Sequence, residues 1–301
     1  MGLFSRNYNT PGPGVSPDEP RKKGFARLFE LIARDVWPIF KAGFLAFLSA
    51  LPFVFLLSLS IITHALLFVL IAGLLGGMLV GPQLTGLADT ILRSLRDEPG
   101  YWWETYKRAW KRNAKASLLP GAVFGLIFAI QIFTVYHLSS LSMGISTLII
   151  LFVGALLSLG LSNYVWPQIA LLDLPFGGML KNMVLLFMGY LPRSAGAMLV
   201  QVVYWGAFLL FFPLTSILLP LTGFWVPMLL ATFIIYPPLN KSFDIENGIK
   251  KIREKQMNPD PLPEENAWPP VAQTAGSSAA DTPADDGETD DAPAADDGKA
   301  T

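Results

Sequence analysis

The sequence contains no cysteine, which excludes a disulfide, a thiolate metal site and a cysteine nucleophile. Charged residues are also scarce, at 15% of the 301 residues against about 25% in soluble domains. The N-terminal region lacks the short apolar core and cleavage site of a secretory signal. We therefore expect an integral membrane protein, and the missing cysteines leave its compartment open.

Signatures of catalysis are missing as well. No HExxH, GxSxG, Walker or GxGxxG pattern stands in a fitting context, so we expect no enzyme. We also expect no cofactor and no nucleic-acid partner. The only histidines, His64 and His137, fall near predicted turns between spans. A paired metal or pH-sensing site and simple turn-lining polar residues both remain open for them.

Long apolar runs dominate what is present. A helix needs about 20 apolar residues to cross a bilayer. Six runs reach that length, at 42–62, 65–88, 117–137, 145–168, 195–217 and 219–238. Prolines interrupt the last two, which spans tolerate where neighbouring helices satisfy the freed backbone groups. We expect an all-α membrane protein with six transmembrane helices in three hairpins.

Composition changes at both ends of the chain. Residues 1–23 are polar and rich in proline and glycine, which predicts a flexible arm. Residues 259–301 hold eleven acidic residues and one lysine, which predicts a disordered tail. The tail either solvates the protein or engages a basic partner. The membrane domain is expected between them, at 24–258.

The basic residues occur at alternate connections between the spans. Residues 1–41 and 89–115 hold seven each, residues 174–194 hold two and residues 241–255 hold five. The other three connections, near 63–64, 138–144 and 216–222, hold none. Because basic loops stay inside, we expect both termini in the cytoplasm and three tight outside turns.

The first two basic segments have helical periodicity and predict helices lying in the headgroup layer. In 24–37, Phe25, Leu28, Phe29, Ile32 and Val36 form one apolar stripe, while Arg27, Glu30 and Arg34 face away. In 101–116, one helical face holds Trp103, Tyr106, Trp110 and Ala114, and its flank holds Lys107, Lys111 and Lys115, which predicts an anchor on anionic lipid. The anchoring residues are Trp102, Trp103, Trp110, Lys107, Arg108, Lys111 and Arg112. A docking site for a partner is the alternative.

These two segments also align with each other in a register of 74 residues. Glu30 pairs with Glu104, Arg34 with Arg108 and Lys41 with Lys115. The hairpin ends GPQLTGLAD, WPQIALLD and YPPLNKSFD resemble one another too. We predict three parallel repeats, each an interfacial helix followed by a two-span hairpin. The third interfacial segment, 176–192, is more apolar, and three placements stay open for it: lying in the interface, dipping into the bilayer, or spanning it.

The runs RKKGFARLFELIARDVW and GPQLTGLADTILRSLRDEPGYWWETYKRAWKRNAKAS resemble the YesL-like family. That family is a group of bacterial polytopic membrane proteins with a domain of unknown function. The resemblance covers roughly 10–250 and is strongest at 81–117. It implies a bacterial plasma membrane. Because some members are encoded beside sugar-uptake and polysaccharide-degradation systems, it also implies a supporting role in carbohydrate acquisition.

A few residues inside the predicted spans separate two hypotheses. Gln131, Asn163, Gln168 and Gln201 are the deepest polar residues, and they either bond across helices or line a polar cavity. A continuous polar cavity would favour a small-solute, sugar-like carrier, with Trp166, Tyr204 and Trp205 stacking on the sugar. A solid apolar core would favour a non-enzymatic accessory component of a sugar-uptake membrane complex. Gly73, Gly77 and Gly81, with Gly121 and Gly125, predict close helix packing.

Overall fold

The computed structural model describes residues 22, 24–98, 100–138, 144–211 and 214–257, and these residues form an all-α membrane protein. Most of the predicted N-terminal arm and all of the predicted tail lie outside this part of the chain. The chain divides into two units after Ile252, and only α10 (Ile245–Met257) carries described residues past that boundary. The first unit holds all of the apolar helices.

The first hairpin pairs one long helix with a segmented one. α1 (Phe25–Thr63) runs to a tight turn, and the chain returns through α2, a π-helical turn and α3. The returning elements are α2 (Leu66–Ile71), η1 (Ala72–Gly76) and α3 (Gly77–Leu95).

The second and third hairpins follow with a short helix between them. α4 (Trp102–Tyr136) pairs with α5 (Ile145–Leu171), and α6 (Phe176–Gly189) leads into the third hairpin. That hairpin pairs α7 with a broken second arm. Its elements are α7 (Leu191–Leu210), η2 (Leu214–Leu218), α8 (Leu219–Thr222) and α9 (Trp225–Phe243).

Five helices are long and apolar enough to cross a membrane, and a sixth span arises if a bent pair counts as one. The bent pair joins Leu214–Thr222 to Trp225–Phe243 at 56°. With the bent pair counted as one span, this agrees with the six predicted spans, and the bend lies in the last span, one of the two that prolines interrupt. Large apolar side chains such as Phe55, Ile150 and Leu209 are exposed along the helices, as a lipid-facing surface requires.

The helices carrying the predicted interfacial segments differ from the expectation. α1 is continuous through Pro38 and α4 is continuous from Trp102, so residues 24–37 and 101–116 are not separate helices. At 1.5 Å per residue α1 is about 58 Å long, whereas the hydrocarbon core is about 30 Å thick. The charged first turns of α1 therefore extend beyond the apolar span.

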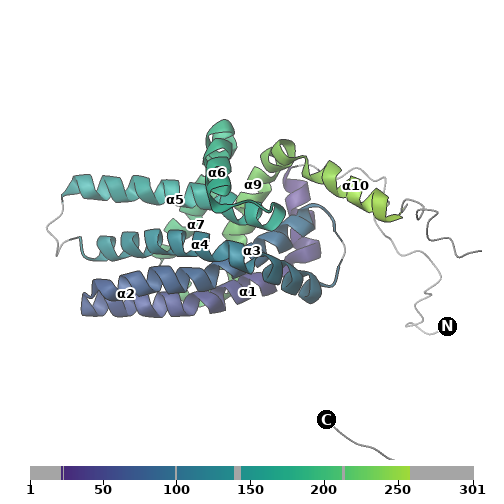
Figure 1. Cartoon of the computed structure of the whole chain (residues 1–301). Helices are drawn as coiled ribbons and strands as arrows, with labels where there is room; N and C mark the ends of the chain where they lie inside the picture. The colour runs from purple at the N-terminus through teal and green to yellow at the C-terminus, as the bar shows by residue number, and fades with distance from the viewer. Residues whose placement is uncertain (1–21, 23, 99, 139–143, 212–213, 258–301) are drawn as a thin grey trace, which may run out of the picture. The chain divides into compact units, whose positions relative to one another are not determined.

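Only the third hairpin has a separate leading helix. α6 has 14 residues, which is about 21 Å and too short to span a bilayer. It lies across the direction of α4 and α5 (Figure 1). Of the readings open for 176–192, a full span is excluded by this length.

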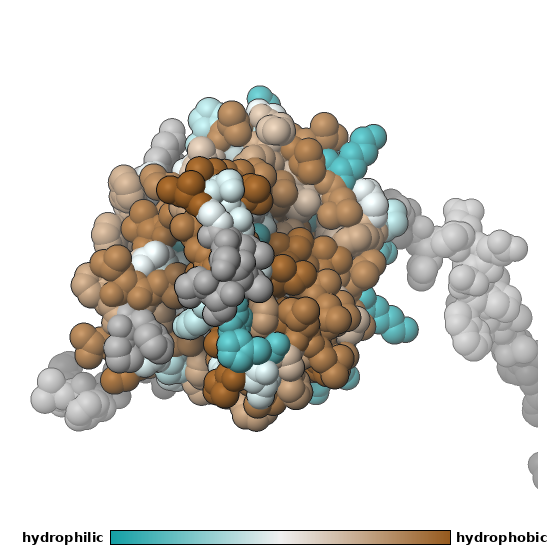
Figure 2. Space-filling model, turned by 90° about the vertical axis from the view of Figure 1, so that its left-hand side faces the viewer, coloured by the Kyte–Doolittle hydropathy of each residue, from teal (hydrophilic) through white to brown (hydrophobic). Residues whose placement is uncertain are grey.

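The connections place charge at one end of the first unit. The basic end contains the connections 96–101 and 172–175 and the end of α9. The uncharged end contains the C-terminal ends of α1, α4 and α7, and those of α1 and α4 lie together at the left of Figure 1. Viewed end-on in Figure 2, this uncharged end is mostly hydrophobic.

α3 lies at the centre of the bundle, packed against α1, α4 and α5. Its contact with α4 is made by glycines, which lets the two backbones touch. A Cβ on Gly81 of α3 would lie 2.5 Å from the carbonyl oxygen of Ser117, and one on Gly73, in the preceding η1, would lie 2.6 Å from Cα of Leu126. The predicted glycine contact is therefore confirmed, and it lies between two hairpins of one chain.

Candidate functional site

A network of ion pairs joins the start of α1 to the end of α3 at the basic end. Asp97 has a left-handed backbone (φ 57°) and accepts hydrogen bonds from Arg27, at 2.6 Å, and from Arg34. The same guanidinium groups donate to the final carbonyls of α3, from Arg27 to Leu95 at 3.3 Å and from Arg34 to Ser94 at 2.8 Å. The arginines thereby cap the C-terminus of α3, where a helix favours positive charge.

The network continues along α3. Asp89 is 3% exposed, and one of its oxygens accepts a hydrogen bond from Arg93 Nε at 2.7 Å. Glu98 accepts one from Arg96 Nε at 2.9 Å, and Asp35 accepts one from Ser94 Oγ at 2.5 Å. These carboxylates accept hydrogen bonds from other side chains of the protein, and such bonds stabilise the ends of helices.

A small cavity lies beside this network. Its volume is about 80 Å³, and Asp35, Arg93, Glu98 and Trp102 are among its lining residues. Ligand pockets for small molecules usually measure about 300–1,000 Å³. This cavity has room for roughly two or three waters, at about 30 Å³ each.

The predicted membrane anchor is only partly an outward-facing surface. Lys107, Arg108 and Lys111 are exposed, and Trp103 is 51% exposed. Tyr106, which was expected on the same lipid-facing stripe, is instead 3% exposed, and its hydroxyl donates to Gln83. The correction follows from Gly86, whose missing side chain makes room for the Tyr106 ring on α3.

The other predicted anchors make contacts within the bundle. Trp102 and Trp110 are partly buried against the core. Lys41 Nζ lies 5.2 Å from the Trp102 ring and 5.1 Å from the Trp37 ring, so a cation sits against two aromatic faces. Arg112 Nη2 donates to the carbonyl of Ala170 at 3.0 Å, which ties α4 to the end of α5.

The four amides predicted in the spans do not form one site. Gln201 Nε2 donates to Asn163 Oδ1 at 2.9 Å, and Trp205 Nε1 donates to Gln201 Oε1 at 3.1 Å. Gln131 Nε2 donates to Ser158 Oγ at 3.3 Å, on a different pair of helices. None of the four amides lines that small cavity or the cavity beside the two histidines.

Gln168 differs from the other three. It is 1% exposed, and neither atom of its side-chain amide has a hydrogen-bond partner within the described part of the chain. The side-chain nitrogen Nδ2 of Asn163 is also buried and has no hydrogen-bond partner among the described residues.

The aromatic residues considered for sugar stacking are packed against the protein. Trp166 is 7% exposed and contacts Phe124, with ring centroids 6.4 Å apart. Tyr204 and Trp205 meet edge-on at 5.4 Å, and the Tyr204 hydroxyl donates to Thr222 at 2.9 Å. They join α7 to α8, and they do not line either of the two cavities.

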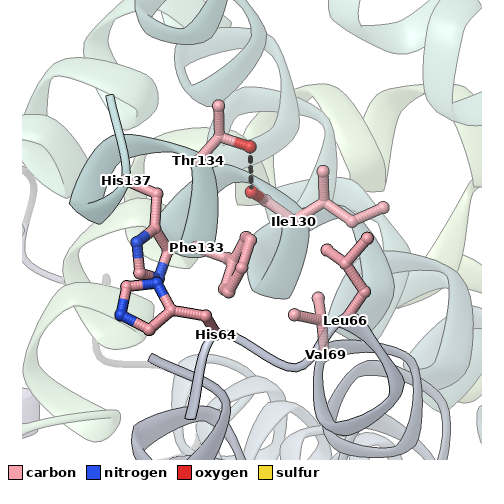
Figure 3. A pocket seen from close by; sticks show the side chains of 7 residues that line it. All are labelled: His64, Leu66, Val69, Ile130, Phe133, Thr134 and His137. Atoms are coloured by element: carbon pink, nitrogen blue, oxygen red, sulfur yellow. Dashed lines mark hydrogen bonds between the residues drawn. The ribbon is translucent and has the colours of Figure 1, made fainter. Parts of the chain in front are cut away.

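The two histidines meet at the uncharged end, with ring centroids 4.5 Å apart. Both line a cavity of about 370 Å³ (Figure 3). Among the described residues, no group of three or more His, Asp or Glu side chains is placed to hold a metal ion.

The sequence reasoning missed the ionic network. It placed Arg27 and Arg34 on an outward face, whereas Arg27 is 8% exposed and Phe25 and Phe29 are 80% and 70% exposed. A usable signal was present, because Arg27 and Arg34 are seven residues apart on one helical face. The acidic sequence DEPG at 97–100 follows the end of α3 and supplies their partner.

No family model matches the chain, and comparisons with curated proteins and with solved structures likewise find no match.

Proposed function

We propose that this chain is a non-enzymatic accessory component of a bacterial plasma-membrane system for carbohydrate uptake or envelope function. It would act as a multi-helix membrane scaffold for a partner. The carbohydrate connection rests on the resemblance to the YesL-like family.

One observation favours the accessory role over a small-solute carrier. Three of the four deepest amides bond to protein groups: Gln201 bonds to Asn163, and Gln131 bonds to Ser158. A transport path needs polar groups that face a shared cavity. The interior of this bundle, with Leu87, Ile91 and Ile235 fully buried, resembles a packed core.

The charged residues support a non-catalytic role, because they too are already hydrogen-bonded to other groups of the protein. Asp35, Asp89 and Glu98 accept hydrogen bonds from Ser94, Arg93 and Arg96. Carboxylates held in this way stabilise helix ends. We also propose that the basic end faces the cytoplasm, because basic connections are retained there.

A small-solute carrier is the second candidate, and one observation favours it. Gln168 is buried with both amide atoms unpartnered among the described residues, and burial of an unpaired amide is costly. A second arrangement of the helices that exposes Gln168 to a polar solute would remove that cost. The π-helical turn at Ala72–Gly76 is a place where such a rearrangement could begin, since π turns are often found at functional sites.

The discriminating experiment is affinity purification of the full chain from native membranes, with a tag that contains no histidine, followed by identification of co-purifying proteins. A stoichiometric membrane partner supports the accessory role. Recovery of the chain alone, under conditions that preserve known membrane complexes, contradicts it. Uptake of sugars into proteoliposomes, abolished by Gln168→Leu, would then establish the carrier.

A matched pair of variants locates the docking surface in the same experiment. Lys107 and Lys111 are exposed on α4, and Lys250 and Lys251 are exposed on α10. Each pair is changed to glutamine, which removes two positive charges. Loss of the partner with the α4 pair alone places the docking surface on α4, whereas equal loss with both pairs indicates a general dependence on charge.

A further inference from the structure

The fold brings together the only two histidines in the sequence. His64 follows α1 and His137 follows α4, so they belong to different hairpins. Their ring centroids are 4.5 Å apart and the ring planes cross at 48°. In Figure 3 the two rings face each other beside the cavity that they help to line.

Both histidines follow the C-terminal end of a helix. His64 takes a left-handed conformation (φ 56°) at the end of α1, in a turn where Ser60 Oγ donates to the carbonyl of Ala65 at 3.0 Å. The backbone N–H of His137 donates to the carbonyl of Phe133 at 3.1 Å. The His137 ring packs on the Phe133 ring, with centroids 4.3 Å apart.

The electrostatic surroundings favour a cation. The C-terminal end of a helix carries partial negative charge, and two such ends meet here. Neither α1 nor α4 has a basic residue in its last turn. The sequence has no Asp, Glu, Lys or Arg in 42–88 or in 116–172, so these parts of α1 and α4 place no fixed positive charge beside the histidines.

One ligand atom is already buried and available. His137 is 6% exposed, and its Nε2 has no hydrogen-bond partner within the described residues. The cavity beside it measures about 370 Å³ and is otherwise lined mainly by apolar side chains. Thr134 contributes the remaining side-chain hydroxyl, which donates to the carbonyl of Ile130 at 2.8 Å.

We propose that His64 and His137 bind a borderline divalent metal ion, with Zn²⁺ as the representative, through one nitrogen of each ring. Imidazole suits Zn²⁺, Cu²⁺ and Ni²⁺, whereas Ca²⁺ and Mg²⁺ require oxygen ligands. Zn–N bonds of about 2.0–2.1 Å place two rings on one ion at centre-to-centre distances of about 4.5–6 Å. The observed separation lies at the short end of that range.

The remaining coordination positions are filled by water from the cavity. Two protein ligands are fewer than the four of a structural zinc site, so the ion exchanges readily. The ion joins the turn between α1 and α2 to the end of α4. Because it binds only the folded arrangement, it stabilises the contact between the first two hairpins.

The test uses the full chain in detergent or nanodiscs, purified with a tag that contains no histidine. Titration with Zn²⁺ is followed by calorimetry and by histidine-selective NMR, in which the chain has two side-chain signals. We expect one Zn²⁺ per chain and simultaneous shifts of both signals. Because ligation needs a neutral imidazole, acidification should weaken the binding.

Two conservative variants separate ligation from folding. His64→Asn keeps a residue that tolerates the left-handed conformation, and His137→Phe keeps a ring against Phe133. Each should lower Zn²⁺ affinity at least tenfold, and the double variant should lose this binding. Tyr136→Phe, at an exposed ring next to His137, should leave the affinity unchanged.

Three results would overturn the site. Absence of Zn²⁺ binding by the unaltered chain rejects it directly. Equal binding by the double variant places the ion elsewhere, for example on the acidic residues of 259–301. A response of both histidine signals and of thermal stability to acid, with none to Zn²⁺, Cu²⁺ or Ni²⁺, would replace the metal site with a proton-sensitive contact.

Discussion

Asp97 shows how much a single residue contributes at the basic end. Its carboxylate accepts hydrogen bonds from Arg27 and Arg34, two residues that lie one above the other on α1. Burial alone would raise the pKa of Asp97, but these two hydrogen bonds and the charges of the arginines outweigh it and hold the pKa below 3.8. The connection after α3 is thereby fixed to α1.

Removing this charge should weaken the fold. We expect Asp97→Asn to lower the free energy of unfolding in detergent by about 1.5–3 kcal/mol, because the buried Arg27 loses a charged acceptor. Asparagine tolerates the left-handed backbone, so conformational strain does not confuse the result. Asp173→Asn, at an exposed carboxylate in the connection after α5, is the control and should change stability by less than about 0.5 kcal/mol. Equal losses in both variants would show that Asp97 has no special role.

The depressed pKa of Asp97 also sets a pH dependence. A carboxyl group whose pKa is lower in the folded state adds stability that is complete well above its unfolded pKa, near 3.8. That stability is lost as the pH falls through the lower, folded value. The free energy of unfolding, measured from pH 6 to pH 2, should therefore fall more steeply with decreasing pH in the unaltered chain than in Asp97→Asn. Parallel curves would mean that other groups set the acid response.

The glycines of α3 and α4 act at the scale of whole elements. A Cβ on Gly77 would overlap the carbonyl oxygen of Gly121 and lie 3.0 Å from Cα of Gly125. The contact is backbone on backbone, so no flexible side chain can move aside. The close approach of the first two hairpins therefore depends on these positions having no side chain.

A matched pair of substitutions tests this dependence. Gly77→Ala should lower the free energy of unfolding by about 1–3 kcal/mol, because the helices must separate. Gly206→Ala, in α7, adds the same methyl group with nothing within 4 Å of it, and should leave stability unchanged or raise it by up to about 1 kcal/mol. Both are measured by unfolding in the same detergent. A neutral Gly77→Ala would show that the backbone contact contributes little.

Elements were predicted well where one periodic property determines them. Apolar runs of about 20 residues placed the hairpins, and the proline-interrupted last span is the bent pair. Helix continuity was not predictable, because Pro38 usually ends or kinks a helix but lies inside α1. The π-helical turn at Ala72–Gly76 was not predicted either, and the close packing of Gly76 on Phe53, a residue of α1, is not visible in the local sequence.

At the scale of the molecule, the sites were hard to predict because their residues are far apart in the sequence and meet only through the packing of the helices. Asn163 and Gln201 were both identified, but their hydrogen bond spans 38 residues and depends on how α5 packs against α7. The same holds for His64 and His137, each predicted at a turn, whose contact depends on α2 packing against α4. Sequence identified these polar residues, and the packing of the helices determined their partners.

The separation of charge between the two ends predicts how the molecule crosses the membrane. Described charged residues such as Arg93, Lys111 and Arg112 belong to the basic end, and 42–88 and 116–172 carry no Asp, Glu, Lys or Arg. If basic connections are retained in the cytoplasm, the turns after α1 and α4 face outward. This orientation can be measured directly, because the chain has no cysteine of its own.

Single cysteines at Lys111 and Ser146 report the two sides. Both residues are exposed, the first on α4 at the basic end and the second in the first turn of α5 at the uncharged end. A membrane-impermeant thiol reagent applied to intact cells should label Ser146→Cys, and should label Lys111→Cys only after permeabilisation. The cysteine-free chain is the control for background. The opposite pattern would place the basic end outside and would mean that these charges serve the ion pairs and a partner, and do not set the orientation.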